Sequence, residues 1–175
     1  MNEFLIVVDM QADFIDGAIG SPEAVAILPA VAQKIRSFPG KIIFTQDTHD
    51  PGYLSTQEGK NLPVEHCIKG TAGWQIHPGL LKAAEGKDVH TFEKPTFGST
   101  QLAEWLTAEN ASQPIDGIEL VGLCTDICVV SNALLLKAYL PEVPIGVDSA
   151  CCAGTTPDNH KSALVTMASC QIRVS

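Results

Sequence analysis

The chain has 175 residues, a mass of 18.6 kDa and a hydrophobic content of 45%. These values predict one globular domain over residues 1–175, because two domains sharing this length would each have a small core. Asp and Glu total 20 residues and Lys and Arg total 11, which gives a formal net charge of −9. We therefore expect no nucleic-acid partner, since few cations are available to displace the counterions of phosphates.

No apolar run reaches the ~20 residues needed to span a bilayer, and the first residues lack the basic and hydrophobic segments of an export signal. We expect a cytoplasmic protein without a membrane partner. The 6 cysteines are then expected to be reduced, since a chain that can bury its own core does not need a disulfide framework. At least one of these thiols is a candidate for chemistry.

Apolar runs alternate with helical patterns along most of the chain. The apolar runs predict strands at residues 4–8, 41–45, 88–92, 118–121, 144–147 and 171–174. Helical spacing with start and stop signals predicts helices at residues 24–38, 99–106, 126–140 and 156–168. This alternation is typical of a doubly wound α/β domain. Residues 46–79 show little periodicity, and a loop this long inside a compact domain is usually functional.

Reactive side chains follow several of the predicted strands. Asp9 comes directly after the first strand, Asp47 and His49 follow the second, Lys94 follows the run at 88–92, and Cys128 follows the run at 118–121. In an open parallel sheet the ligand crevice lies beyond the carboxyl ends of the strands, so these side chains are expected to meet. Each residue alone also fits an ordinary turn or surface role, and their coincidence at one edge is what favours a site.

Cys128 is the candidate nucleophile. It falls near the start of a predicted helix, where free amide N–H groups and the helix dipole are expected to lower its pKa and stabilise a thiolate. The alternative is a small buried apolar residue. Asp9 can take the thiol proton and later give it to a leaving amine, and the Lys94 ammonium can hold both anions in place.

The long loop carries a candidate metal site. Asp-x-His followed by a further carboxylate and imidazole offers mixed oxygen and nitrogen ligands, which suit a divalent ion such as zinc, manganese or iron. The predicted ligands are Asp47, His49, Glu58 and His66. The alternative is a polar surface loop without a metal.

Three segments together resemble the isochorismatase-like cysteine hydrolases, and the resemblance extends over almost the whole chain. These segments are VDMQADF at residues 8–14, FEKPTFG at residues 92–98 and GLCTDICV at residues 122–129. The resemblance implies a three-layer α/β/α sandwich with a six-stranded, mainly parallel, Rossmann-like sheet in the order 3-2-1-4-5-6. It also implies that Asp9, Lys94 and Cys128 form a catalytic triad.

The same resemblance assigns a role to the peptide between Leu123 and Cys124. At this point the family has a non-proline cis bond, which is rare elsewhere in proteins. The cis bond would direct the amide of Cys124, together with that of Cys128, into an oxyanion hole.

The nicotinamidase branch of the family adds a divalent metal beside the triad, and the predicted metal ligands match its ligand set. The implied reaction is attack of the Cys128 thiolate on nicotinamide, release of ammonia with a proton from Asp9, and hydrolysis of the thioester by water. Phe14 and Phe97 are expected as substrate walls. Leu62 stands where this branch commonly has an aromatic residue that sandwiches the substrate ring.

Hydrolysis of another small amide or N-carbamoyl compound, or an isochorismatase-type reaction, is the alternative on the same fold. A third class, a binding protein with a degenerate site, has no need for Asp9, Lys94 and Cys128 together. The expected partner is a small-molecule amide, and family analogy implies a homo-oligomer.

Overall fold

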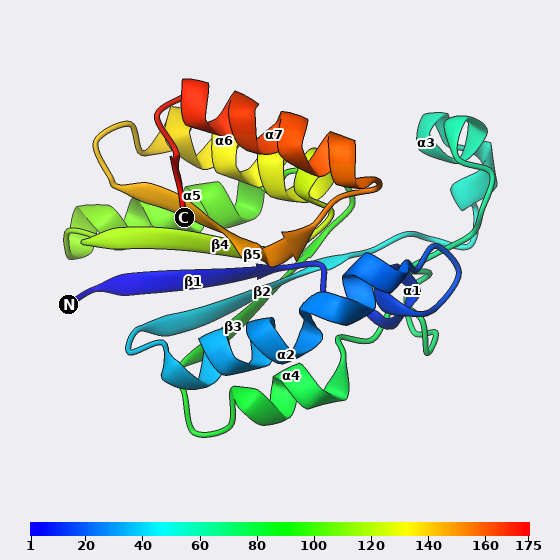
Figure 1. The fold of residues 1–175 in the computed structure, drawn as a ribbon, viewed down its shortest axis with the longest axis horizontal. Coiled ribbons are helices and arrows are strands. Elements are labelled where there is room, and N and C mark those ends of the chain that lie inside the picture. Colours follow the sequence, from blue (N-terminus) through cyan, green and yellow to red (C-terminus); the bar gives the residue numbers. More distant parts are fainter.

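All the strands lie in one parallel sheet in the computed structural model, which describes residues 1–175. The strand order is β3-β2-β1-β4-β5-β6, which confirms the expected α/β fold and its order (Figure 1). The strands are β1 (Glu3–Val8), β2 (Lys41–Asp47), β3 (Val89–Lys94), β4 (Gly117–Leu123), β5 (Ile145–Ala153) and β6 (Arg173–Val174).

Helices cover both faces of the sheet (Figure 1). One layer contains α1 (Ala12–Ile15), α2 (Pro22–Ser37) and α4 (Pro78–Ala83). The other contains α5 (Thr100–Ser112), α6 (Val130–Tyr139) and α7 (Pro157–Ser169). A 3-10 turn, η1 (Tyr53–Ser55), and α3 (Gln57–Asn61) project beyond both layers, and a π-helical turn, η2 (Thr125–Val129), precedes α6.

The central strand β1 packs into two separate cores. Phe4, Ile6 and Val8 point into the core beneath α5, α6 and α7. Leu5 and Val7 point into the core beneath α2 and α4. A strand covered on both faces needs a continuous apolar run rather than an alternating one. Residues 4–8 of β1 are therefore all apolar. Both faces are filled, so the edge where the strands end is left for a site.

The helix starts follow the capping signals in the sequence. The Ser21 side chain accepts a hydrogen bond from the Ala24 amide, and Pro22 occupies the first turn of α2. The Thr156 side chain accepts from the Asn159 amide at the start of α7. These caps satisfy amide groups that have no partner inside the helix.

Some elements differ from the prediction. Strand β5 continues to Ala153, well beyond the predicted residues 144–147. The apolar run breaks at Asp148, and the pairing with β4 shifts register between Leu120 and Gly122, so the sequence pattern loses its regularity there. Helices α1, α3 and α4 are too short for a helical period to be recognised in the sequence.

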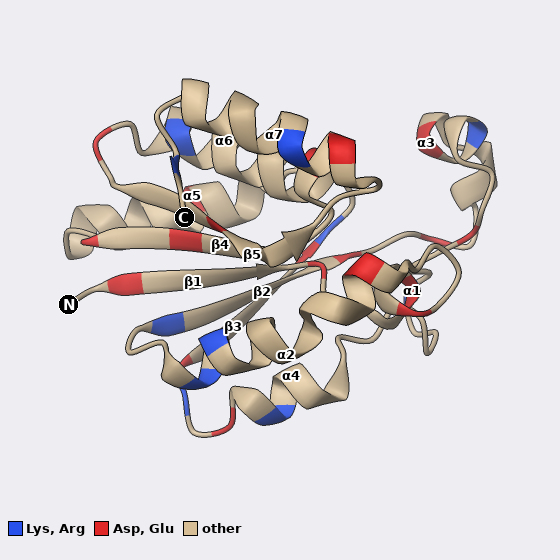
Figure 2. Cartoon of the chain, viewed as in Figure 1, with Lys and Arg blue, Asp and Glu red and all other residues tan.

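No helix has both the length and the apolar character needed to cross a membrane. Figure 2 shows Lys and Arg residues dispersed over several helices and strands.

Candidate active site

Three strand ends bring Asp9, Lys94 and Cys128 together. Asp9 directly follows β1, Lys94 is the last residue of β3, and Cys128 lies in η2, after β4. All three side chains are buried. The Lys94 ammonium lies 2.6 Å from Asp9 Oδ2 and donates to Cys128 Sγ at 3.4 Å. The structure therefore places a cation between a carboxylate and a thiol, in the arrangement that the sequence predicts.

Burial and mutual contact set the charges of this group. Burial raises the pKa of Asp9, and Lys94 offsets only part of that rise. Burial alone would lower the pKa of Lys94, but Asp9, Cys128 and Asp47 raise it further, so the amine is held as an ammonium. A carboxylate with a raised pKa is suited to accept and return a proton.

The expected direction of the Cys128 pKa is wrong. Burial, followed by the nearby Asp9 carboxylate, raises the pKa of the Cys128 thiol well above its ordinary value of 9.0, and Lys94 only partly opposes this. The helix-start argument omitted the cost of burying a thiolate. The raised pKa favours the protonated thiol, and the Asp9 carboxylate lies close to it.

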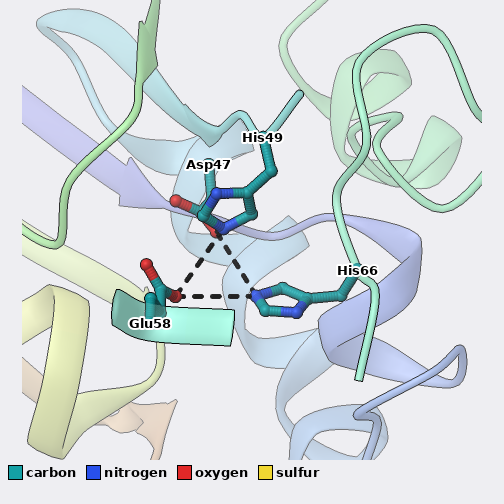
Figure 3. Close-up of side chains that lie close together, drawn as sticks. All are labelled: Asp47, His49, Glu58 and His66. Carbon is teal, nitrogen blue, oxygen red and sulfur yellow. Dashed lines mark ion pairs between the residues drawn. The ribbon is translucent and has the colours of Figure 1, made fainter. Parts of the chain in front are cut away.

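The predicted metal ligands converge on one point (Figure 3). Each of the residues offers a donor atom, and these atoms all lie within 4.8 Å of one another. His49 Nε2 lies 2.9 Å from Asp47 Oδ2 and 3.7 Å from Glu58 Oε1. His66 Nε2 lies 3.7 Å from Asp47 Oδ2 and 3.9 Å from Glu58 Oε1. The structure thus brings together all the residues that the sequence predicts as metal ligands.

The surroundings of both imidazoles fit a metal ion. His49 Nε2 is buried and close to Asp47, yet it is not aligned for a hydrogen bond with any acceptor. His66 Nδ1 lies 2.8 Å from the carbonyl oxygen of Val64, which favours a proton on Nδ1 and leaves Nε2 free to coordinate. Two nitrogens and two carboxylates form a donor set suited to zinc, manganese or iron.

Asp47 joins the metal-ligand group to the triad. Its Oδ1 accepts from the Lys94 ammonium at 3.3 Å, and its Oδ2 faces the histidines. Burial raises the pKa of Asp47, but His49 and Lys94 lower it by more, so this carboxyl is held as a carboxylate.

A cavity of about 640 Å³ opens beside these groups. Cys128, Asp47 and His66 line it. The predicted substrate walls do so as well: Phe14, Leu62 and Phe97. Leu62 and Phe97 are 39% and 44% exposed, which places them at an open part of the cavity. The cavity thus offers a reactive end and apolar walls.

Asn132 is a part of the site that the sequence did not indicate. Its side chain donates to the carbonyl oxygens of Cys128 at 2.8 Å and Phe97 at 3.1 Å, and it accepts from the Ser99 amide at 2.9 Å. It is fully buried. Its position one helical turn after Cys128 was the available signal, because residues four apart share a helix face.

The remaining cysteine and peptide expectations agree with the structure. All the cysteines are free. The peptide between Leu123 and Cys124 is cis. The Cys124 carbonyl accepts hydrogen bonds from the amides of Ile127 and Val129, which closes the η2 turn around Cys128.

Comparison with known proteins identifies the family. Residues 3–175 match the model of the isochorismatase domain. The chain is similar to the nicotinamidase/pyrazinamidase of Mycobacterium tuberculosis, with 29% identity over 144 residues that cover 74% of this chain and 75% of that protein. The crystal structure of nicotinamidase/pyrazinamidase from Bacillus subtilis has a TM-score of 0.83 and 27% identity, and the match covers 100% of both chains. Pyrazinamidase of Pyrococcus horikoshii in complex with zinc has a TM-score of 0.82 and 27% identity, with 100% of this chain and 99% of that chain covered. The chain therefore belongs to the isochorismatase domain family.

Proposed function

We propose that this chain, as a single domain, is a metal-assisted cysteine amidohydrolase that converts nicotinamide and water into nicotinic acid and ammonia. The observation that carries the proposal is the Lys94 ammonium, which contacts Asp9, Cys128 and Asp47 and so joins a nucleophile to a metal-ligand group. The names of the similar proteins, which are nicotinamidases and pyrazinamidases, supply the substrate class.

Acylation begins with a proton transfer from the Cys128 thiol to Asp9. The thiolate attacks the carboxamide carbon, and the amides of Cys124 and Cys128 donate to the oxyanion that forms. Asp9 then protonates the amide nitrogen, the C–N bond breaks, and ammonia leaves. Lys94 stays cationic and offsets the negative charge that moves between the sulfur and the carboxylate. The product of this half-reaction is a thioester on Cys128.

Deacylation uses the same groups, with water as the nucleophile and the Cys128 sulfur as the leaving group. Asp9 takes a proton from a water molecule while the water oxygen attacks the thioester carbon. The C–S bond breaks, nicotinic acid is released, and the proton on Asp9 returns to Cys128. The enzyme thereby regains its starting protonation state.

Asp47, His49, Glu58 and His66 would hold the divalent ion. When bound, the ion supplies a Lewis-acid site for the substrate ring nitrogen. The chain itself orients the substrate between Phe14, Phe97 and Leu62, which line the cavity next to these ligands.

The size of the cavity favours a second candidate, the hydrolysis of a larger amide or an N-carbamoyl compound. A water molecule takes up ~30 Å³ in the liquid. If each heavy atom of nicotinamide took up that volume, the whole molecule would fill ~270 Å³, which is an upper estimate. The cavity measures about 640 Å³. Leu62 also leaves its wall less bulky than an aromatic residue would.

Ammonia release by the purified, zinc-loaded protein tests the proposal. The panel contains nicotinamide, pyrazinamide and an N-carbamoyl amino acid, each with and without prior removal of metal by a chelator. Fast release from nicotinamide that chelation abolishes supports the proposal. Release only from the carbamoyl compound favours the second candidate, and no release from any of them contradicts amidohydrolase activity.

A further inference from the structure

The backbone of Asp47 is held by a side chain and not by a neighbouring strand. The pairing of β1 with β2 ends at Val7 and Phe44. On the other side, the pairing of β2 with β3 continues as far as Asp47 and Lys94. Since β1 ends first, the last residues of β2 have no strand beside them on the β1 side.

The peptide groups of Asp47 point to that open side. The amide of Thr48, the next residue, donates to the carbonyl of Lys94 at 2.9 Å and so faces β3. In a strand of a parallel sheet, the N–H and C=O of one residue point to the same side, and the next residue points to the other side. The N–H and C=O of Asp47 therefore face away from β3. Without a partner there, a buried N–H and a buried C=O would remain unpaired.

Gln11 supplies that partner through its side-chain amide. Its Oε1 accepts from the Asp47 amide at 2.7 Å, and its Nε2 donates to the Asp47 carbonyl at 2.8 Å. The same Nε2 donates to the carbonyl of Trp74 at 2.8 Å. Gln11 is fully buried, and both polar atoms of its amide are paired. The side chain therefore acts as a one-residue extension of the sheet.

We infer that Gln11 is a positioning residue for the metal centre, acting through Asp47. The two carboxylate oxygens of Asp47 face different groups, Lys94 on one side and His49 on the other. A displacement of the Asp47 backbone would alter both contacts at once. Gln11 thus fixes the distance between the metal ligands and the triad. This inference rests on the proposed metal-assisted function.

Gln46 provides a matched control. Its Nε2 also donates to the Trp74 carbonyl at 2.8 Å, but no hydrogen bond joins its side chain to the peptide groups of Asp47. Gln46→Met and Gln11→Met therefore remove the same kind of bond to the same acceptor. Only Gln11→Met leaves the N–H and C=O of Asp47 without partners.

The experiment measures zinc affinity by competition with a chromogenic chelator, and the visible absorption spectrum of the Co²⁺-loaded protein. We expect Gln11→Met to weaken zinc binding about 10–100-fold, the usual effect of removing a partner of a metal ligand. We also expect it to change the Co²⁺ spectrum, which reports the ligand geometry. Gln46→Met should match the wild type in both measurements. The Co²⁺ spectrum of the folded, loaded protein separates an altered ligand geometry from a general loss of stability.

Gln11→Asn covers the case in which Gln11→Met does not fold. It keeps an uncharged amide but is one methylene too short to reach both peptide groups of Asp47, so weaker zinc binding and an altered spectrum are expected again. Wild-type zinc affinity and spectrum in the Gln11 variants would overturn the inference and leave the proposed function standing. If the wild-type protein binds none of zinc, manganese and iron, the metal-assisted function fails and the inference fails with it.

Discussion

Thr45 and Asp9 exchange two hydrogen bonds at the ends of adjacent strands. The Thr45 hydroxyl donates to Asp9 Oδ1 at 2.6 Å and accepts from the Asp9 amide at 3.2 Å. Both residues are fully buried, and Asp9 has a φ of 46°, in the left-handed region that non-glycine residues rarely adopt. With Lys94 at Asp9 Oδ2, each carboxylate oxygen has its own partner. Thr45 therefore fixes the orientation of the Asp9 carboxylate.

Thr45→Val should slow turnover while preserving the fold. The variant keeps the shape of the side chain but removes a hydrogen bond to a charged group, which contributes about 1.5–3 kcal/mol, or roughly 10–150-fold in kcat/KM. Thr45→Ser keeps the hydroxyl and should stay near wild-type activity. Steady-state kinetics of both variants provide the check, and equal rates for Val and Ser would show that the hydroxyl does not orient Asp9.

Zinc should raise the melting temperature of the protein. An ion that binds only the folded chain adds about 2.7 kcal/mol of stability at 100 times its dissociation constant. His49→Ala should remove this zinc-dependent shift, because it deletes one of the converging donors. His90→Ala is the control, since His90 pairs with Asp88 and lies outside the ligand group. Thermal melts with and without zinc decide the matter, and a full shift in His49→Ala would exclude this site.

Leu62→Trp should narrow the substrate preference. Leu62 lines the cavity and is 39% exposed, so a larger ring can enter the space without disturbing the core. We expect a lower KM for nicotinamide and a fall in kcat/KM for larger amides. Leu54→Trp is the matched control, because Leu54 is also exposed, at 48%, but does not line the cavity. If both tryptophan variants change the ratio of kcat/KM for nicotinamide to kcat/KM for larger amides equally, Leu62 does not form part of the substrate-binding wall.

Lys34 links α2 to two strands, and its contribution should depend on pH. Its ammonium lies 2.6 Å from Asp148 Oδ2 and 3.2 Å from Glu119 Oε1. Burial raises the pKa of Asp148, but Lys34 lowers it by more, to below its ordinary value of 3.8. A lowered folded-state pKa stabilises the protein above that ordinary value, and the stabilisation is lost as the pH falls through the folded-state pKa.

Asp148→Asn should therefore cost about 1 kcal/mol of unfolding free energy at neutral pH, as expected for a partly exposed ion pair. The difference from wild type should disappear in acid, once Asp148 is protonated. Urea unfolding across this pH range gives the measurement. Asp158→Asn removes an exposed pair with Lys161 and a charge in the first turn of α7, so a smaller effect on the unfolding free energy is expected. If Asp148→Asn lowers the unfolding free energy in acid as much as at neutral pH, the effect comes from packing and not from charge.

The strands and the reactive residues at their ends could be predicted from the sequence because both follow from local pattern. The run at residues 4–8 has no polar residue, so it predicts a buried parallel strand. Once the sheet is parallel, Asp9, Asp47 and Lys94 must share an edge. Ser21 and Pro22 likewise signal the start of α2, which begins at Pro22, two residues before the predicted helix at 24–38.

Other features could not be predicted because they depend on where distant segments meet. Gln11 matters only because β1 ends before β2, and Asn132 only because the loop at Phe97 passes over α6. The Cys128 pKa depends on burial, which a helix-start pattern does not report. The continuation of β5 past Asp148 depends on a register shift that leaves no period in the sequence.

Turnover of nicotinamide by Cys128→Ala is the measurement that tests the central claim most directly. Cys128 lies beside the Lys94 ammonium, which also contacts Asp9, and the proposed mechanism makes Cys128 the nucleophile, so we expect ammonia release to fall to background in this variant. Zinc binding should persist, because the ligand group does not include Cys128. Ammonia release at the wild-type rate from a folded, zinc-loaded Cys128→Ala protein would contradict catalysis through Cys128.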